Sequence, residues 1–140
     1  MIIRPAKRVI LALCLALGGA SVTPITTYAA EPEQVARCFF VYSPIYEVAK
    51  RRSDQALLAY ATPRMAWLAG YFEANRNNKV VADQFKASGT ANKAAGIRLE
   101  GQVVKSLDDR AAGIPGADEA LTKALKPAEE CDQALDLQGK

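Results

Sequence analysis

Apolar residues recur at steps of three and four positions along most of the chain, which is the period of an α-helix with one buried face. The first such stretch runs from about Glu33 to Ala61. Ser43 and Pro44 lie inside it, and proline removes one helical hydrogen bond and clashes with the preceding turn. We therefore expect a kink or a restart at Pro44, and the unbroken apolar period favours the kink.

Thr62 and Pro63 have the pattern of a helix start, a hydroxyl cap followed by proline at the first helical position. They predict a second helix that ends near Asn75. The asparagine-rich segment 75–79 predicts a turn. The expected core stripe of this second helix is formed by Met65, Leu68 and Phe72, with Trp67 and Tyr71 beside it.

The last part of the chain is divided by GIPG at residues 113–116, a strong stop signal. Residues 79–112 before it form one helix or two, because SGT at 88–90 can interrupt the pattern. The final helix is expected to begin at Asp118 and Glu119, whose charges complement the helix dipole. Pro127 is expected to kink this helix, and its apolar stripe consists of Ala117, Ala120, Leu121, Ala124, Leu125, Ala128, Cys131 and Leu135.

No segment alternates between apolar and polar residues in the manner of a strand. The sequence therefore predicts an all-α protein with one domain at residues 31–140. We expect a small, disulfide-linked bundle of about four helices in up-down order, some of them kinked at proline.

Residues 1–30 have the three parts of a secretory signal peptide: basic residues up to Arg8, an apolar run from Val9 to Ala20, and small residues before the end at Ala30. The apolar run is shorter than the roughly 20 residues that span a bilayer. We expect Sec-type export, cleavage near Ala30, and a periplasmic or secreted location. The alternative is an uncleaved membrane anchor.

Cleavage would remove Cys14 and leave Cys38 and Cys131, an even number that favours one disulfide in an exported protein over two separate buried thiols. Both lie on apolar stripes, one near the start of the first helix and one near the end of the last. These helices are antiparallel neighbours in an up-down bundle, so the two thiols fall at the same level. In the chain-entropy model, such a long loop closure stabilises the fold by about 4–5 kcal/mol.

The formal net charge of +3 belongs to the leader, because 15 basic and 15 acidic residues follow residue 30. Nucleic acid and anionic membranes are therefore not expected as partners. The chain has no histidine, which removes the usual general base and the commonest transition-metal ligand. With two cysteines and no CxxC motif, we expect no metal site, no redox-active thiol pair and no cofactor.

Paired acids also argue against an enzyme, since adjacent residues such as Asp108 and Asp109 diverge on a helix. Asp132 shares helix faces with Glu129 and Asp136, which we interpret as a solubilising acidic surface. A hydrolase that uses Asp or Glu remains a minor alternative.

Every aromatic residue after the leader lies between Phe39 and Phe85. Four of these side chains lie slightly off the expected core stripes and are the candidates for a partner-binding patch: Phe40, Tyr46, Trp67 and Tyr71. The favoured interpretation is nevertheless that they belong to the core or its boundary, because aromatic side chains are mostly buried for packing reasons, and the binding patch is the alternative.

These observations favour an exported, non-enzymatic helical protein that binds another protein, in the manner of an inhibitor, an immunity protein or an envelope accessory. One alternative is a periplasmic chaperone that binds many clients weakly, and another is a helical bundle that binds a small molecule. The identity of the partner and the oligomeric state are left open.

Overall fold

The computed structural model describes residues 30–139, and all regular elements in this range are α-helices. The expected signal peptide lies outside the described residues. None of the helices in residues 30–139 has an apolar stretch of the length that a bilayer-spanning segment needs. The helices are α1 (Pro32–Arg52), α2 (Gln55–Ala74), α3 (Lys79–Ala111), α4 (Ala117–Ala124) and α5 (Lys126–Ala134).

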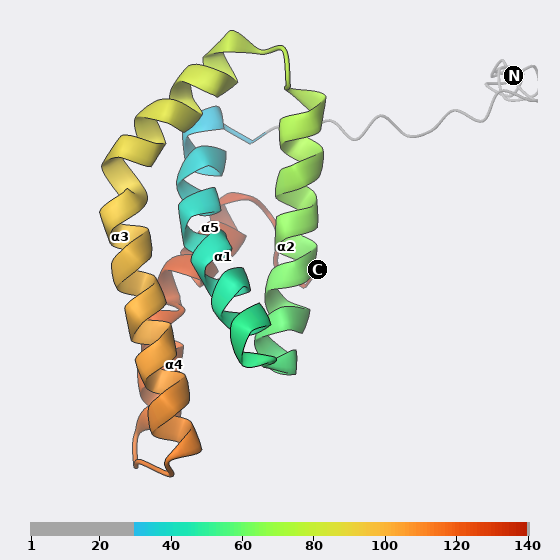
Figure 1. The fold of residues 1–140 in the computed structure, drawn as a ribbon. Coiled ribbons are helices and arrows are strands. Elements are labelled where there is room, and N and C mark those ends of the chain that lie inside the picture. Colours follow the sequence, from blue (N-terminus) through green and yellow to red (C-terminus); the bar gives the residue numbers. More distant parts are fainter. Residues whose placement is uncertain (1–29, 140) are drawn as a thin grey trace, which may run out of the picture.

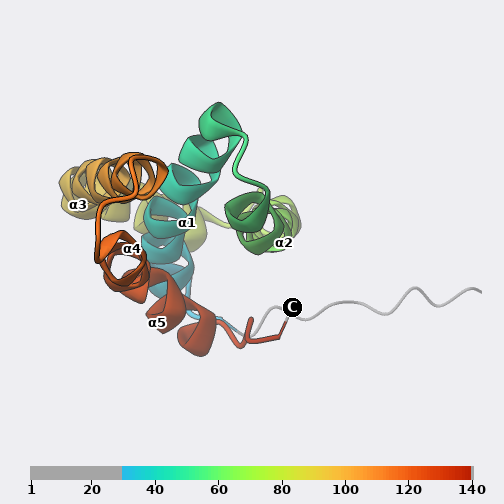
Figure 2. The same cartoon turned by 90° about the horizontal axis from the view of Figure 1, so that it is seen from below.

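Helix α1 is the centre of the bundle (Figures 1 and 2). α2 and α3 lie on opposite sides of it, α5 covers a third side, and α4 packs antiparallel to α3. The first four helices run in alternating directions (Figure 1), so the predicted all-α, up-down bundle is confirmed. In the described residues, the backbone of α2 packs closely against α1 and against no other helix.

The break between the first two helices is at Ser53 and Asp54, so the predicted break at Thr62 is wrong. Ser53 adopts a left-handed conformation (φ 52°), and its N–H bonds to carbonyls of the last turn of α1. Asp54 then caps α2 by accepting a hydrogen bond from the N–H of Leu57 (2.9 Å). The apolar period hid this break because it continues from Ala49 to Leu57 on both sides of the turn.

Both internal prolines are accommodated within continuous helices. α1 runs through Pro44, so a restart there is excluded, and α2 runs through Pro63. Pro63 is exposed, so the carbonyl that loses its N–H partner lies on the solvent side of the helix.

Region 79–111 is one helix, which settles the question that the sequence left open. Asn78 caps it by accepting from the N–H groups of Val80 and Val81. Gly96 of this helix packs directly against α1. A Cβ at this position would lie 2.9 Å from the carbonyl oxygen of Phe40. The absence of a side chain there lets α1 and α3 approach closely.

The C-terminal segment follows the prediction closely. α3 ends before GIPG, in which Gly113 and Gly116 have φ of 69° and 82°. α4 begins at Ala117 with two acids in its first turn. The helical path then breaks at Leu125, and Pro127 lies in the first turn of α5.

The predicted disulfide between Cys38 and Cys131 is present, with a Cα–Cα distance of 5.6 Å and a sequence separation of 93. Both cysteines are buried within the hydrophobic core, together with Val35, Ile45, Leu68, Val103, Leu121 and Leu137. A disulfide is consistent with a location outside the cytoplasm.

Candidate functional site

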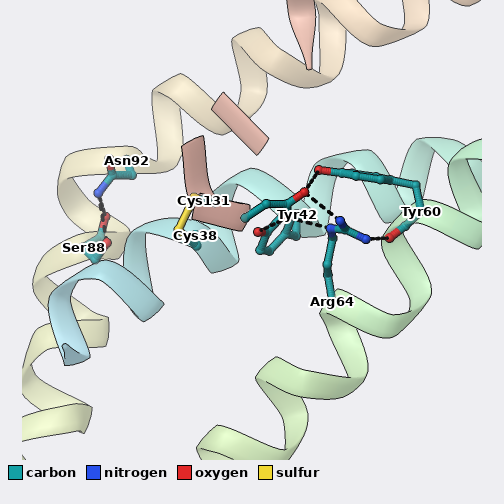
Figure 3. The surroundings of a disulfide bond; sticks show 8 residues. Cys38, Tyr42, Tyr60, Arg64, Ser88, Asn92 and Cys131 are labelled. Atoms are coloured by element: carbon teal, nitrogen blue, oxygen red, sulfur yellow. Dashed lines mark hydrogen bonds and ion pairs between the residues drawn. A yellow bond between two sulfur atoms is a disulfide. The ribbon is translucent and has the colours of Figure 1, made fainter. Parts of the chain in front are cut away.

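Beside the disulfide lies a buried network of polar side chains that joins three helices (Figure 3). Its centre is Asp132 of α5, the residue that follows Cys131. Arg64 of α2 donates to both carboxylate oxygens, from Nε (2.7 Å) and from Nη2 (2.7 Å). The hydroxyls of Tyr42 (2.6 Å) and Tyr60 (3.0 Å) donate to the same carboxylate.

Helical spacing explains why these residues meet. Tyr42 lies one turn after Cys38 on the same face of α1, and Tyr60 lies one turn before Arg64 on α2. The guanidinium of Arg64 lies 3.8 Å from the centre of the Tyr60 ring and also donates to the carbonyl of Tyr60 (2.6 Å).

The charges in this network stabilise one another. Burial alone would raise the pKa of Asp132, but the hydrogen bonds from Arg64, Tyr42 and Tyr60 outweigh it, and the pKa of the carboxyl is lowered. The pKa of Tyr42 and that of Tyr60 are raised, mainly by burial and further by the adjacent carboxylate. Arg64 has its own pKa raised, chiefly by its hydrogen bonds to Asp132.

This network is suited to holding helices together rather than to chemistry. The carboxylate is ionised and occupied by donors from three side chains. The phenols keep their protons at neutral pH, so they cannot act there as bases or nucleophiles. Among the described residues, no buried side-chain nitrogen or oxygen lacks a hydrogen-bond partner.

The interpretation of Asp132 as part of an exposed acidic surface is therefore wrong. Asp132 is 7% exposed, whereas Glu129 and Asp136 are exposed as expected. The expected divergence of Asp108 and Asp109 is confirmed, because they pair with Arg52 and Lys105 on different sides of α3.

The aromatic residues form a second cluster where α1, α2 and α3 meet. Phe39 contacts Phe40, Phe72 and Phe85 edge to face, with ring centres 5.1–5.9 Å apart. Phe40 stacks on Phe85 and would touch a Cβ at Gly89. The side chains of Phe72 and Phe85 thus connect α2 to α3, whose backbones are apart.

The four candidate partner-binding residues have different surroundings. Tyr71 is 2% exposed, so it lies in the core, as the favoured interpretation has it, although it was placed beside the core stripe of its helix. Phe40, Tyr46 and Trp67 are half-buried against the core. Trp67 stacks on Tyr71 (5.8 Å between ring centres), and Tyr46 lies under the ammonium group of Lys50. Whether these residues bind a partner stays a prediction.

The solvent side of α2 differs from that of the other long helices. Between Ala56 and Ala69, none of its exposed residues is charged, and the charged residue within this span, Arg64, is buried. α3, by contrast, exposes charged side chains in most of its turns, from Lys79 to Arg110. We call this surface the α2 outer face; it comprises Ala56, Ala59, Thr62, Pro63, Ala66 and Ala69.

A shallow groove of about 290 Å³ lies on another side of the molecule, between α1 and α3. Phe40, Pro44 and Ile97 line it together with the charged residues Glu47 and Lys93. Ile97 is one of the large apolar side chains that the described residues expose, at 61%.

Comparison with known proteins gives this chain no relative. No family model, curated protein or solved structure matches it. Among the described residues, no group of three or more cysteine, aspartate or glutamate side chains is placed to hold a metal ion.

Proposed function

We propose that this protein is exported through a Sec-type signal peptide and acts, without catalysing a reaction, by binding another protein through the α2 outer face. The observation that carries the proposal is the lack of exposed charge along four turns of a helix that packs against one neighbour. A helix that is apolar on all sides is usually covered on all sides.

The chemistry of this face favours a particular kind of partner. Alanine dominates it, and small side chains allow the backbone of another helix to approach closely. A rigid face of this kind fits one complementary helix better than many unrelated clients, which are usually bound by flexible apolar side chains. We therefore favour a specific partner over the general chaperone considered from the sequence.

The proposed location rests on two observations. The leader pattern of residues 1–30 is typical of export. The buried disulfide supports the same location, because disulfides form and persist mainly in oxidising compartments. A periplasmic or secreted protein satisfies both.

The test uses three forms of the processed, oxidised protein as bait in a native envelope extract: wild type, Ala66→Glu and Ala87→Glu. Ala66 lies on the α2 outer face, and Ala87 is a matched exposed alanine on α3. Circular dichroism first establishes that both variants fold. We expect one stoichiometric partner that wild type and Ala87→Glu retain and Ala66→Glu loses, because a buried, unpaired carboxylate weakens the contact.

Two results would contradict the proposal. Equal retention by all three baits would place the binding surface elsewhere on the molecule. Failure of all three to retain any protein would contradict the protein-binding function itself. Truncation of Trp67 or Tyr71 is a less clean test, because both rings pack against the core.

A further inference from the structure

The disulfide and the buried ion pair hold the same turn of α5, because Cys131 and Asp132 are consecutive residues. α5 has nine residues, and isolated helices shorter than about 12–15 residues are marginal in water. Its position therefore depends on its anchors: the bond to Cys38, the ion pair to Arg64, the hydrogen bonds that Asp132 accepts from Tyr42 and Tyr60, and the burial of Ala128 and of Leu135 and Leu137 just after the helix.

The same turn also anchors α2. The backbone of α2 packs on α1, and Arg64 reaches from α2 to the carboxylate on α5. Both side chains of this pair are shielded from water, with exposed fractions of 7% and 10%. A guanidinium keeps its charge at any ordinary pH, so moving Asp132 away would leave a buried cation without its carboxylate.

We propose that formation of the disulfide is the step that docks both α2 and α5 onto α1. In the reduced chain, α1 and α3 pack together through close contacts such as that between Gly96 and Phe40. α5 is then free to leave, and Asp132 leaves with it. Loss of that carboxylate destabilises the buried position of Arg64 and loosens α2, although neither cysteine lies in α2.

The oxidation is an ordinary thiol–disulfide exchange. The thiols of Cys38 and Cys131 give up two protons and two electrons as their S–S bond forms, and a disulfide-bearing oxidant is reduced to two thiols. In the folded protein the two cysteines are 0% and 1% exposed. The completed bond is therefore protected from further exchange while α5 stays docked.

If the α2 outer face binds the partner, as the proposed function has it, the disulfide also controls binding, because it docks α2. Binding would then be confined to protein that is oxidised after export, and the chain would not bind its partner in a reducing compartment. The docking step itself is independent of any partner and can be tested without one.

The experiment measures amide hydrogen exchange by mass spectrometry on the processed protein purified after export. Four forms are compared: oxidised wild type, Cys38→Ser/Cys131→Ser, oxidised Asp132→Asn, and oxidised Glu129→Gln. Glu129 is an exposed acid on the same helix and serves as the matched control. In the cysteine variant we expect exchange in α2 and α5 to accelerate at least about tenfold more than exchange in residues 96–107 of α3.

The Asp132→Asn form separates the two anchors, because its disulfide is intact. We expect faster exchange in α2 in this form and wild-type exchange in the Glu129→Gln form. If the cysteine variant unfolds as a whole, with equal acceleration in α1, α2 and α3, selective docking is refuted. Wild-type protection of α2 in Asp132→Asn would likewise overturn the proposal, because the link from α5 to α2 would then carry no stability.

Discussion

Replacing Asp132 with leucine tests how much the buried network contributes to the fold. The change removes the carboxylate that accepts hydrogen bonds from Arg64, Tyr42 and Tyr60. The side chain of Arg64 is 7% exposed and cannot lose its charge. Breaking a buried pair in this way costs about 3–5 kcal/mol. This is a large fraction of the roughly 5–15 kcal/mol that stabilises a typical domain.

Replacing Arg64 with methionine should have a smaller effect that depends on pH. Without Arg64, the carboxyl of Asp132 keeps the burial that raises its pKa and loses the first of the three side-chain hydrogen bonds that lower it, so its pKa is higher than in wild type. A carboxyl whose folded-state pKa is lowered loses stability as the pH falls, and a higher folded-state pKa makes this loss smaller. The Arg64→Met variant should therefore become more stable, relative to wild type, as the pH falls to about 4 and below.

The double variant Arg64→Met/Asp132→Leu removes both charges. Replacing a whole buried pair by apolar residues is often close to neutral. The hydroxyls of Tyr42 and Tyr60 lose their acceptor, which costs about 1–3 kcal/mol. The double variant should therefore be more stable than Asp132→Leu alone, although less stable than wild type.

Urea unfolding with the disulfide intact measures all three variants. Trp67 is the single tryptophan of the chain and lies on α2, so its fluorescence reports on the helix that Arg64 anchors. Glu129→Leu is the control on the exposed side of α5 and should change stability by no more than about 0.5 kcal/mol. The reasoning is refuted if Asp132→Leu costs no more than this control, or if the effects of the two single changes simply add.

Four further outcomes follow from the packing and from the pKa shifts. Gly96→Ala should destabilise the protein by about 1–3 kcal/mol, since the new Cβ meets backbone in α1. Gly101→Ala, with open space around it, should stabilise by about 0.5–1 kcal/mol; urea unfolding distinguishes the two, and equal effects would contradict the close contact. Above about pH 10 stability should fall, because the raised pKa values of Tyr42 and Tyr60 keep both phenols protonated in the folded state while the unfolded chain ionises. On the acid side, the lowered pKa of Asp132 means that its contribution persists down to about pH 4 and is lost below it; unfolding curves across this range would contradict both statements if stability stayed constant at the two extremes.

The disulfide was predictable because it follows from helix periodicity and topology together. Cys38 and Cys131 fall on apolar stripes, and an up-down order of helices brings the start of the first beside the end of the last. Neither step depends on the detailed course of the chain between them. The end of α3 before residues 113–116 was predictable for a similarly local reason, because the glycines there adopt positive φ angles, which a helix cannot continue through.

The boundary between α1 and α2 was not predictable from periodicity, because the apolar spacing continues across it. Two signals compete there: an aspartate cap at Asp54 and a threonine–proline pair at Thr62 and Pro63. α1 ends at Ser53, and the aspartate cap then starts α2. Pro63 is tolerated inside α2 because it faces solvent. A threonine–proline pair is thus weak evidence for a helix start, because a proline on the exposed side can also lie inside a helix.

This boundary error also concealed the buried charge. With α2 starting at Gln55, its buried residues follow one stripe, and Arg64 is a member of it: Leu57, Ala61, Arg64, Leu68 and Tyr71. A break at Thr62 divides that stripe and shifts the expected core to Met65 and Phe72. Tyr71 was placed beside the core stripe for the same reason.

Asp132 carries the complementary signal on α5. Ala128, Cys131 and Leu135 are buried, and residues three, four and seven positions after Ala128 share its helix face. Asp132 is the residue four positions on, so the stripe that contains the cysteine also contains the acid. A buried acid beside a disulfide, and a buried arginine in a segment of α2 (residues 56–69) that has no other charged residue, each require a partner of opposite charge. Taken together, the two stripes imply that α2 and α5 meet through these side chains, although their backbones do not pack against each other.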